Sequence, residues 1–155
     1  MIRMPTWPAG DESVDRIAWQ SFSFYPRLGH VGRYVAEHLG EQITLRDAAR
    51  VACLEHNYFS AFFHKKVGIT FSEWLRVVRV MRSTQLLRAH DLTVSRAAYE
   101  VGFGSVRAFE RSFRRIIGMT PAQFKWHVQP ENGTITKSDA SLRNNVAMSM
   151  IPRVS

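Results

Sequence analysis

The sequence contains a single cysteine and no long apolar run, and each absence excludes a class of protein. Cys53 alone rules out an intramolecular disulfide and a multi-cysteine metal site, which favours a reducing cellular compartment. No stretch approaches the roughly 18 to 20 apolar residues that span a bilayer, and the N-terminus lacks the basic and then apolar order of a signal peptide. We therefore expect a cytoplasmic protein with no membrane among its partners.

The sequence also lacks the residue groupings on which catalysis and cofactor binding depend. It shows no nucleophile placed beside a base, no paired carboxylates and no glycine-rich phosphate loop. The stretch Gly102-Phe103-Gly104 has neither the following glycine nor the helix context of a dinucleotide site. The six histidines are spread over several predicted elements without the spacing of a zinc site. We expect that the protein is not an enzyme and holds no cofactor or metal.

Acidic residues are scarce relative to basic ones. The 155 residues include 21 Lys or Arg against 13 Asp or Glu, which gives a net charge of +8. Residues 29–128 hold most of the excess, with 15 basic against 8 acidic residues, whereas residues 1–28 and 129–155 are nearly balanced. A charge excess within the folded part favours a polyanionic partner, either nucleic acid or an anionic membrane surface.

Composition divides the chain into three parts. Residues 1–28 form a short extension rich in aromatic residues and proline, with a partly strand-like alternation over residues 17–24. Residues 29–128 are long enough to bury one core. Residues 129–155 are polar and without periodicity, so we expect a disordered tail.

An internal repeat organises residues 29–128. Two sets of small and aromatic residues carry it: Leu45, Ala49 and Cys53 match Val94, Ala98 and Gly102 at an offset of 49, and Phe59, Phe63 and Gly68 match Phe109, Phe113 and Gly118 at an offset of 50. Each copy predicts a short helix, a tight turn and a second helix, which is the layout of a helix-turn-helix unit. We predict units over residues 29–69 and 90–128, the first opening with an amphipathic helix over residues 30–39.

A longer helix is predicted between the two units, over residues 71–89. Thr70 and Glu73 have the spacing of a capping box at its start, as do Thr44 with Asp47 and Thr120 with Gln123 at the starts of two shorter predicted helices. At about 1.5 Å per residue this helix would be about 28 Å long. Successive major grooves on one face of DNA lie roughly 34 Å apart. One rigid helix would therefore hold two recognition helices about one duplex turn apart.

The second helix of the second copy combines an apolar face with a basic one. Ser105 is a favourable N-cap and Gly118 a favourable C-terminal residue, so the helix has a defined start and end. On a helical wheel the apolar side chains fall opposite four arginines, Arg107, Arg111, Arg114 and Arg115. A helix fits the major groove of B-DNA, and the guanidinium group binds phosphate or guanine in a bidentate manner.

These motifs resemble the DNA-binding domain of the AraC/XylS family of bacterial transcription regulators. The second unit carries the resemblance most strongly, through Ala98-Tyr99-Glu100-Val101-Gly102-Phe103, Phe109, Phe113, Arg114, Arg115, Gly118 and Thr120-Pro121. The first unit and the connecting helix match through Leu45, Ala49, Leu54, Tyr58, Phe63, Lys65, Gly68, Trp74, Leu75, Arg79, Leu86 and Leu87. The resemblance implies an all-α, seven-helix, bipartite double helix-turn-helix domain over residues 29–128.

The family resemblance also implies a function and a set of site residues. In such a domain the third and sixth helices enter adjacent major grooves of double-stranded promoter or operator DNA. The residues implied to read bases are His56, Asn57, Ser60, Ala61, His64, Val106, Arg107, Glu110 and Arg111, and those implied to meet phosphates are Lys65, Arg114 and Arg115. The resemblance further implies an activator that binds an asymmetric site as a monomer, with RNA polymerase as a further partner.

Two residues of the first unit depart from the family pattern. The family usually has glycine at Cys53 and a capping serine at Glu55. A turn that requires a positive φ would be strained at Cys53 by about 1 kcal/mol or more, and Glu is an inferior N-cap. We expect a less rigid first unit or a turn that is built differently. We also expect Cys53 to be a small residue packed in a buried turn rather than a redox sensor.

Two further interpretations stay open. Most members of the family carry a separate ligand-sensing and dimerising domain, which residues 1–28 are too short to form. The chain is then either a small stand-alone regulator or a remnant of a larger one. Alternatively, it is a protein-interaction module whose N-terminal aromatic residues bind a protein, with DNA binding incidental.

Overall fold

The computed structural model describes residues 16–88 and 92–128, and every regular element within these ranges is an α-helix. The helices are α2 (Ser21–Phe24), α3 (Pro26–Glu37), α4 (Leu45–Val51), α5 (His56–Val67), α6 (Phe71–Arg88), α7 (Val94–Glu100), α8 (Val106–Ile117) and α9 (Pro121–Val128). The predicted all-α class is therefore confirmed. Helices α3 to α9 correspond to the seven helices expected of the double helix-turn-helix domain.

Local capping motifs set the start of several helices. The capping boxes predicted from three-residue spacing are formed at Thr44, Thr70 and Thr120. In each box the threonine hydroxyl accepts a backbone N–H, and a side-chain oxygen three residues on accepts the N–H of the threonine. Helix α3 begins at Pro26 rather than at the predicted His30, because proline is well suited to the first helical position.

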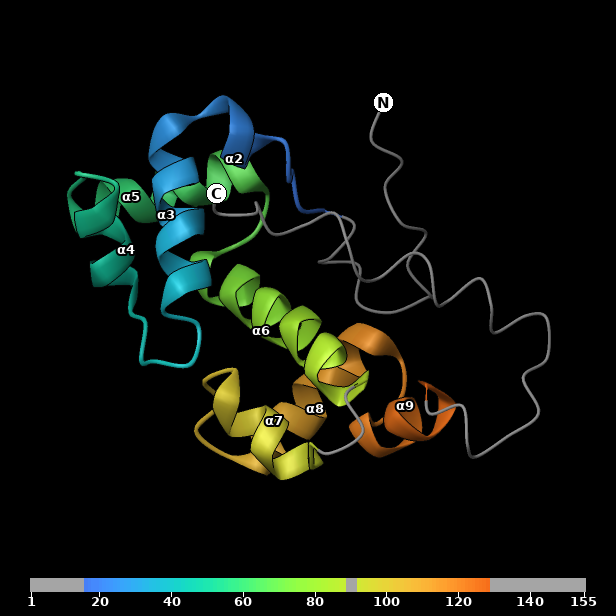
Figure 1. Ribbon diagram of the computed structural model, residues 1–155. Helices are drawn as coiled ribbons and strands as arrows, with labels where there is room; N and C mark the ends of the chain where they lie inside the picture. Colours follow the sequence, from blue (N-terminus) through green and yellow to red (C-terminus); the bar gives the residue numbers. More distant parts are fainter. Residues whose placement is uncertain (1–15, 89–91, 129–155) are drawn as a thin grey trace.

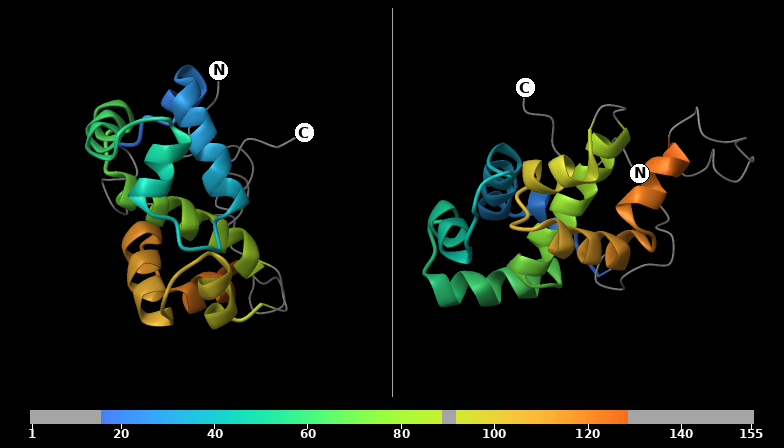
Figure 2. Two further views of the ribbon diagram at one scale, coloured as in Figure 1. Left: turned by 90° about the vertical axis from the view of Figure 1, so that its left-hand side faces the viewer. Right: turned by 90° about the horizontal axis from the view of Figure 1, so that it is seen from below.

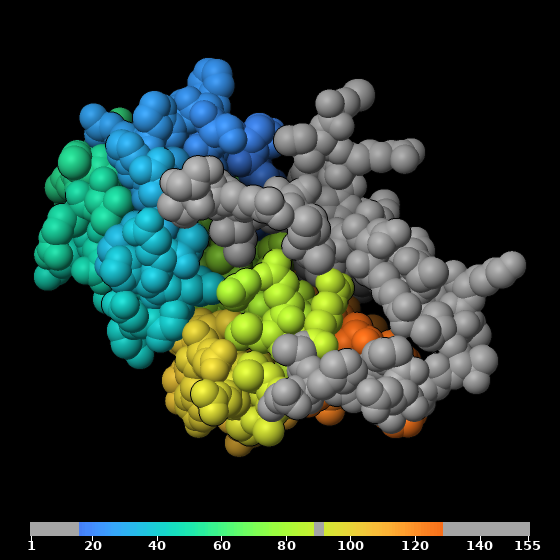
Figure 3. Space-filling view, viewed as in Figure 1, coloured from blue at the N-terminus to red at the C-terminus, as the bar shows by residue number. Residues whose placement is uncertain are grey.

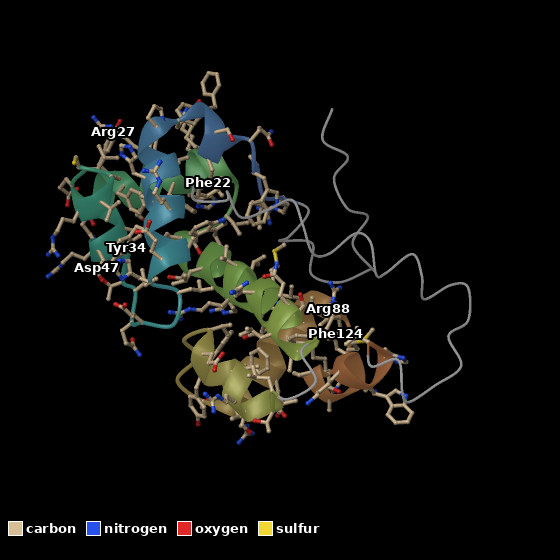
Figure 4. The ribbon with its side chains drawn as sticks, in the orientation of Figure 1. Phe22, Arg27, Tyr34, Asp47, Arg88 and Phe124 are labelled. Carbon is tan, nitrogen blue, oxygen red and sulfur yellow. The ribbon has the colours of Figure 1, made fainter. Side chains whose placement is uncertain are left out.

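Helix α6 connects the first unit, α3 to α5, with the second unit, α7 to α9 (Figure 1). Its 18 residues span about 27 Å at 1.5 Å per residue. Phe71 and Trp74 are buried at its first-unit end, and Leu87 is buried at its second-unit end. In its last turn the Arg88 guanidinium lies 6.0 Å from the centre of the Phe124 ring (Figure 4). The helix is thus anchored in both units.

The middle of α6 does not bury a regular apolar stripe. Val78 and Met81 are only partly buried, whereas Val80, Ser83 and Thr84 are buried. The two hydroxyl groups donate to backbone carbonyls of the same helix, at 2.6 Å for Ser83 and 2.7 Å for Thr84. Their burial therefore leaves no hydroxyl donor unpaired. Because α6 is enclosed by two units, its buried residues do not form one amphipathic stripe.

Each unit has a core built on phenylalanines at the repeated positions. Phe59 and Phe63 are buried in the first unit with their ring centroids 5.7 Å apart. Phe109 and Phe113 are buried in the second unit with their centroids 5.5 Å apart. The repeat in the sequence is therefore a repeat of the packed core, with a matching helix pair around each copy.

The chain before α3 packs against the first unit. The Ser21 hydroxyl donates to the Lys66 carbonyl oxygen at 2.6 Å. The Phe22 ring stacks on Trp74, which lies in the first turn of α6, with ring centroids 4.8 Å apart. Figure 4 shows Phe22 beside the start of α6. The strand-like alternation over residues 17–24 was misleading, because Phe22 packs on the first unit from a helical turn and not from a strand.

Two predicted segments extend beyond the described residues. Residues 1–15, which belong to the predicted extension 1–28, lie outside them, as do residues 89–91 and the predicted tail 129–155. The described part of the extension contributes Ile17 to the core, where it is buried. The domain limits that we drew from composition stay predictions.

Candidate nucleic-acid interface

Helix α8 carries its arginines on the side opposite its buried face. The Ser105 hydroxyl accepts the N–H of Ala108 at 3.2 Å, and Gly118 ends the helix with a φ of 82°, both as predicted. The buried face consists of Phe109, Ser112, Phe113, Ile116 and Ile117. The exposed predicted site residues are Arg107, Glu110, Arg111, Arg114 and Arg115. Val106, the remaining predicted site residue on this helix, is half-buried.

A hollow of about 770 Å³ lies between α8 and the start of α9. It is lined by Arg107, Glu110, Arg111, Arg114, Arg115, Thr120 and Ala122. The lining contains four guanidinium groups and one carboxylate, and this excess of positive charge attracts anions. We did not predict Thr120 and Ala122 as site residues, although the capping box over 120–123 indicated a helix start next to α8.

Helix α5 presents a second exposed face that is less charged. All the site residues predicted on this helix are exposed, namely His56, Asn57, Ser60, Ala61, His64 and Lys65. In the repeat, Asn57 and Ala61 take the places of Arg107 and Arg111. The two faces therefore have the same position in their units but a different chemistry. Tyr58 is 61% exposed next to this face and was not among the predicted site residues.

Glu55 caps the start of α5 with its carboxylate. Its Oε2 accepts the N–H of Asn57 at 2.8 Å and the N–H of Tyr58 at 3.0 Å. These backbone hydrogen bonds, that of Asn57 above all, hold the pKa of the Glu55 carboxyl below its usual value of 4.5. An anionic carboxylate is also favoured at a helix N-terminus. Glu55 thus performs the capping function for which the family usually has serine.

The turn of the first unit is built like that of the second. The Leu54 N–H donates to the Ala49 carbonyl at 3.0 Å, and the Phe103 N–H donates to the Ala98 carbonyl at the same distance. Of the two alternatives, the differently built turn is therefore wrong, because this hydrogen bond is the same in both units. The less rigid first unit stays a prediction.

Cys53 has the positive φ that is strained for any residue other than glycine, as expected from the glycine that the family usually has at this position. Its φ is 53°, and it is the only non-glycine residue with a positive φ in the described parts of the chain. The expectation that it is buried was wrong, because Cys53 is exposed at this turn. Its carbonyl accepts a long hydrogen bond from Arg27 Nη1, at 3.4 Å. Its matching residue in the second unit, Gly102, has a φ of 87°.

Helices α5 and α8 lie toward the same side of the molecule. Figure 2 shows both helices to the left in its left-hand view and low in its right-hand view. This side faces away from the viewer in Figure 1, and the face drawn in Figure 3 consists mainly of α3, α6 and α7 among the described helices. The second helix of each helix pair therefore lies on one common side of the molecule.

The described residues contain neither a cluster of metal-ligating side chains nor a membrane-spanning helix. No three His, Cys, Asp or Glu side chains among them lie close enough together to hold a metal ion. None of the described helices has the length and apolar character needed to cross a bilayer.

Comparison with known proteins identifies the family. A family model described as "Helix-turn-helix domain" matches residues 48–126. A crystal structure of a transcriptional regulator from Chromobacterium violaceum with an AraC-type DNA-binding domain is similar in fold, with a TM-score of 0.65 over 70% of this chain and 97% of that one at 20% identity. The chain belongs to the AraC-type helix-turn-helix family.

Other members of the AraC-type family show how much of each protein the similarity covers. A probable transcriptional regulator, LumQ from Photobacterium leiognathi, is 28% identical over 64% of this chain and 40% of its own. The regulatory protein PocR from Salmonella typhimurium is 30% identical over 62% of this chain and 32% of its own. The chain thus spans about a third to two fifths of the length of these curated relatives.

A solved structure of an AraC-type domain with its ligand is also similar. The DNA-binding domain of the transcriptional factor AdpA, in complex with a target DNA, has a TM-score of 0.62 and is 29% identical. The match covers 68% of this chain and 96% of the AdpA domain. These family members and structural neighbours are transcription regulators and not enzymes.

Proposed function

We propose that the chain is a sequence-specific transcription regulator that reads two adjacent major grooves of double-stranded DNA with α5 and α8. The observation that supports this most is the arginine-lined hollow on α8, on the same side of the molecule as the exposed face of α5. The AdpA domain, which is similar over almost its whole length, binds a target DNA. A DNA ligand would engage both faces at once, so one chain would bind an asymmetric site as a monomer.

We assign roles to the predicted site residues by their position along each helix. The residues nearer the helix starts read bases: His56, Asn57, Ser60, Ala61 and His64 on α5, and Val106, Arg107, Glu110 and Arg111 on α8. Lys65, Arg114 and Arg115, nearer the helix ends, neutralise phosphates. We further propose that the protein acts in the cytoplasm as an activator, with RNA polymerase as a partner, and that residues 29–128 form the DNA-binding domain.

Salt-titrated binding tests this proposal against the protein-interaction alternative. Binding duplexes are first selected from a random pool, and the affinity of the full chain for the selected duplex is compared with its affinity for random duplex. Specific DNA-binding proteins typically prefer their site by about 10³-fold or more. A ratio near one would contradict sequence-specific regulation. It would favour an interaction module, for which the exposed ring of Phe24, 75% accessible, is a candidate contact.

Variants of α8 test the assignment of base contacts. A bidentate arginine to guanine contributes about 1 to 3 kcal/mol of discrimination. We expect Arg107→Ala or Arg111→Ala to relax the preference at one or two base pairs, whereas Lys65→Ala weakens binding to all duplexes alike. If the α8 variants also bound every duplex uniformly more weakly, these arginines would not be base-reading residues.

A further inference from the structure

The two helix-turn-helix units touch each other directly, in addition to their connection through α6. The loop after α3 approaches the turn between α7 and α8. A Cβ atom placed on Gly40 would lie 2.8 Å from the Glu100 carbonyl oxygen. A Cβ atom on Gly102 would lie 2.5 Å from the Leu39 carbonyl oxygen. The absence of side chains at these two glycines therefore lets the backbones of the units meet.

Arg79, which projects from the middle of α6, lies at the same contact. Its Nη2 donates to the Glu41 carbonyl oxygen of the first unit at 2.7 Å. Its guanidinium carbon would be 2.9 Å from a Cβ on Gly102 of the second unit. One side chain of the connecting helix thus contacts the first unit and the turn of the second.

The environment of Arg79 indicates that this contact determines where its guanidinium lies. The side chain is half-buried, and burial lowers the pKa of the guanidinium below its usual value, although it stays protonated. Its Nε is buried and has no hydrogen-bond partner in the described part of the chain. A charged group with an unpaired donor is costly to bury. Helix α6 itself does not require burial of the Arg79 side chain, so the contact between the two units accounts for it.

We propose that Arg79, Gly40 and Gly102 form an inter-unit junction that sets the distance and angle between α5 and α8, and thereby the half-site spacing that the protein accepts. The spacing part of this proposal rests on the two-groove function proposed above. A connecting helix fixes the separation of two bodies better than their rotation about its axis, whereas a second contact away from the axis also restrains that rotation. One base pair of extra spacing moves a half-site by about 3.4 Å and turns it by roughly 35°.

Two glycine variants provide a matched comparison. Gly40→Ala places a methyl group against the Glu100 carbonyl and should push the two units apart. Gly104→Ala is the control, because a Cβ there meets nothing within 4 Å and Gly104 belongs to the same turn of the second unit. Gly102→Ala is unsuitable, since its φ of 87° makes any side chain strained. Arg79→Met removes the charge. Arg79→Lys keeps the charge but changes the hydrogen bond.

The first measurement is binding to duplexes in which the selected half-sites are separated by one base pair more or one fewer. We expect the wild type and Gly104→Ala to lose about tenfold in affinity for each changed spacing, comparable to one mismatched base pair. Gly40→Ala and Arg79→Met should lose less than about threefold or prefer a different spacing, with Arg79→Lys in between. Half-site base preferences should be unchanged, because no residue of the junction lies on the exposed faces of α5 or α8.

The second measurement needs no DNA. A spin label on Cys53, which is exposed and the only cysteine, is paired with a label on a His127→Cys variant in the second unit. We expect one narrow distance distribution in the parent and in Gly104→Ala, and a shifted or broadened one in Gly40→Ala and Arg79→Met. Unchanged distances between the labels in both Gly40→Ala and Arg79→Met would contradict the proposed junction. If the distances change but the wild type shows no preference for any half-site spacing, the two-groove function fails and the spacing role with it.

Discussion

Replacing Cys53 with glycine should stabilise the protein. Cys53 has a φ of 53°, in the left-handed region where a side chain costs about 1–2 kcal/mol. Glycine removes this cost but makes the unfolded chain more flexible, which offsets about 0.5–1 kcal/mol. The thiol is exposed, so its removal costs little packing. The net expectation is a stabilisation of about 0.5–1 kcal/mol.

Thermal unfolding measures this gain directly. For a domain of this size, 1 kcal/mol corresponds to a rise in Tm of about 4–8 °C, so we expect a rise of roughly 2–8 °C for Cys53→Gly. Cys53→Ala is the matched control, because it removes the thiol and keeps the Cβ atom that causes the strain. Its Tm should stay within about 2 °C of the wild type.

The second unit offers the reverse substitution. Gly102→Ala introduces a Cβ at a φ of 87° and only 2.5 Å from the Leu39 carbonyl oxygen. It should therefore lower the Tm by more than Cys53→Gly raises it. A Cys53→Gly protein that is no more stable than Cys53→Ala would refute the reasoning, since it would show that the first turn carries no conformational strain.

Three further predictions concern salt dependence, packing and pH. The double variant Arg114→Ala and Arg115→Ala should reduce the slope of log affinity against log salt by about 2, and Lys65→Ala should reduce it by about 1, because each neutralised phosphate releases about one counterion. A larger reduction for Lys65→Ala than for the double variant would show that the first unit carries the electrostatic binding. Phe22→Ala should lower the free energy of unfolding by about 2 kcal/mol in denaturant titrations, because it removes the ring stacked on Trp74. Phe24→Ala, at a residue 75% exposed, should change it by less than about 0.5 kcal/mol. Equal losses would contradict the packing of α2 described above. Hydrogen bonds hold the pKa of Glu55 below 4.5 in the folded protein, so its capping contribution is present above pH 4.5 and is lost as the pH falls through the folded-state pKa. Glu55→Gln should therefore unfold at a lower temperature than the wild type at pH 7. A difference in unfolding temperature that persisted at pH 2 would argue against the carboxylate cap.

Features set by nearby residues were predictable from the sequence. The capping boxes at Thr44, Thr70 and Thr120 depend on a spacing of three residues, and all three are formed. The start of α8 at Ser105 and its end at Gly118 follow from the same local chemistry. The positive φ at Cys53 could be expected because its counterpart in the repeat is a glycine.

Features set by distant residues were not predictable in the same way. The alternation around Phe22 is partly strand-like, and nothing near it in the sequence indicates that its ring stacks on Trp74. The burial of Ser83 depends on its position between two units, which no single-helix pattern records. Arg79 could be assigned to the family pattern, but its contact with the Glu41 carbonyl joins segments 38 residues apart. Long-range packing decides such contacts, and local spacing carries no information about it.

The exposed faces of α5 and α8 were predictable as sets of residues, although their roles stay proposals. Periodicity placed the apolar side chains of α8 opposite its arginines, and the structure shows that division. The hollow beside α9 was harder to foresee, because Thr120 and Ala122 reach it only after the chain turns at Gly118.

Guanine-methylation interference on the selected duplex tests the central claim most directly, because methylation at N7 blocks contacts in the major groove. The account predicts two clusters of interfering guanines on one face of the DNA, with centres about one helical turn apart. The cluster read by α8 should disappear in the double variant Arg107→Ala and Arg111→Ala, while the other stays. A single cluster, or two clusters that weaken together in that variant, would contradict the reading of two grooves by two separate helices.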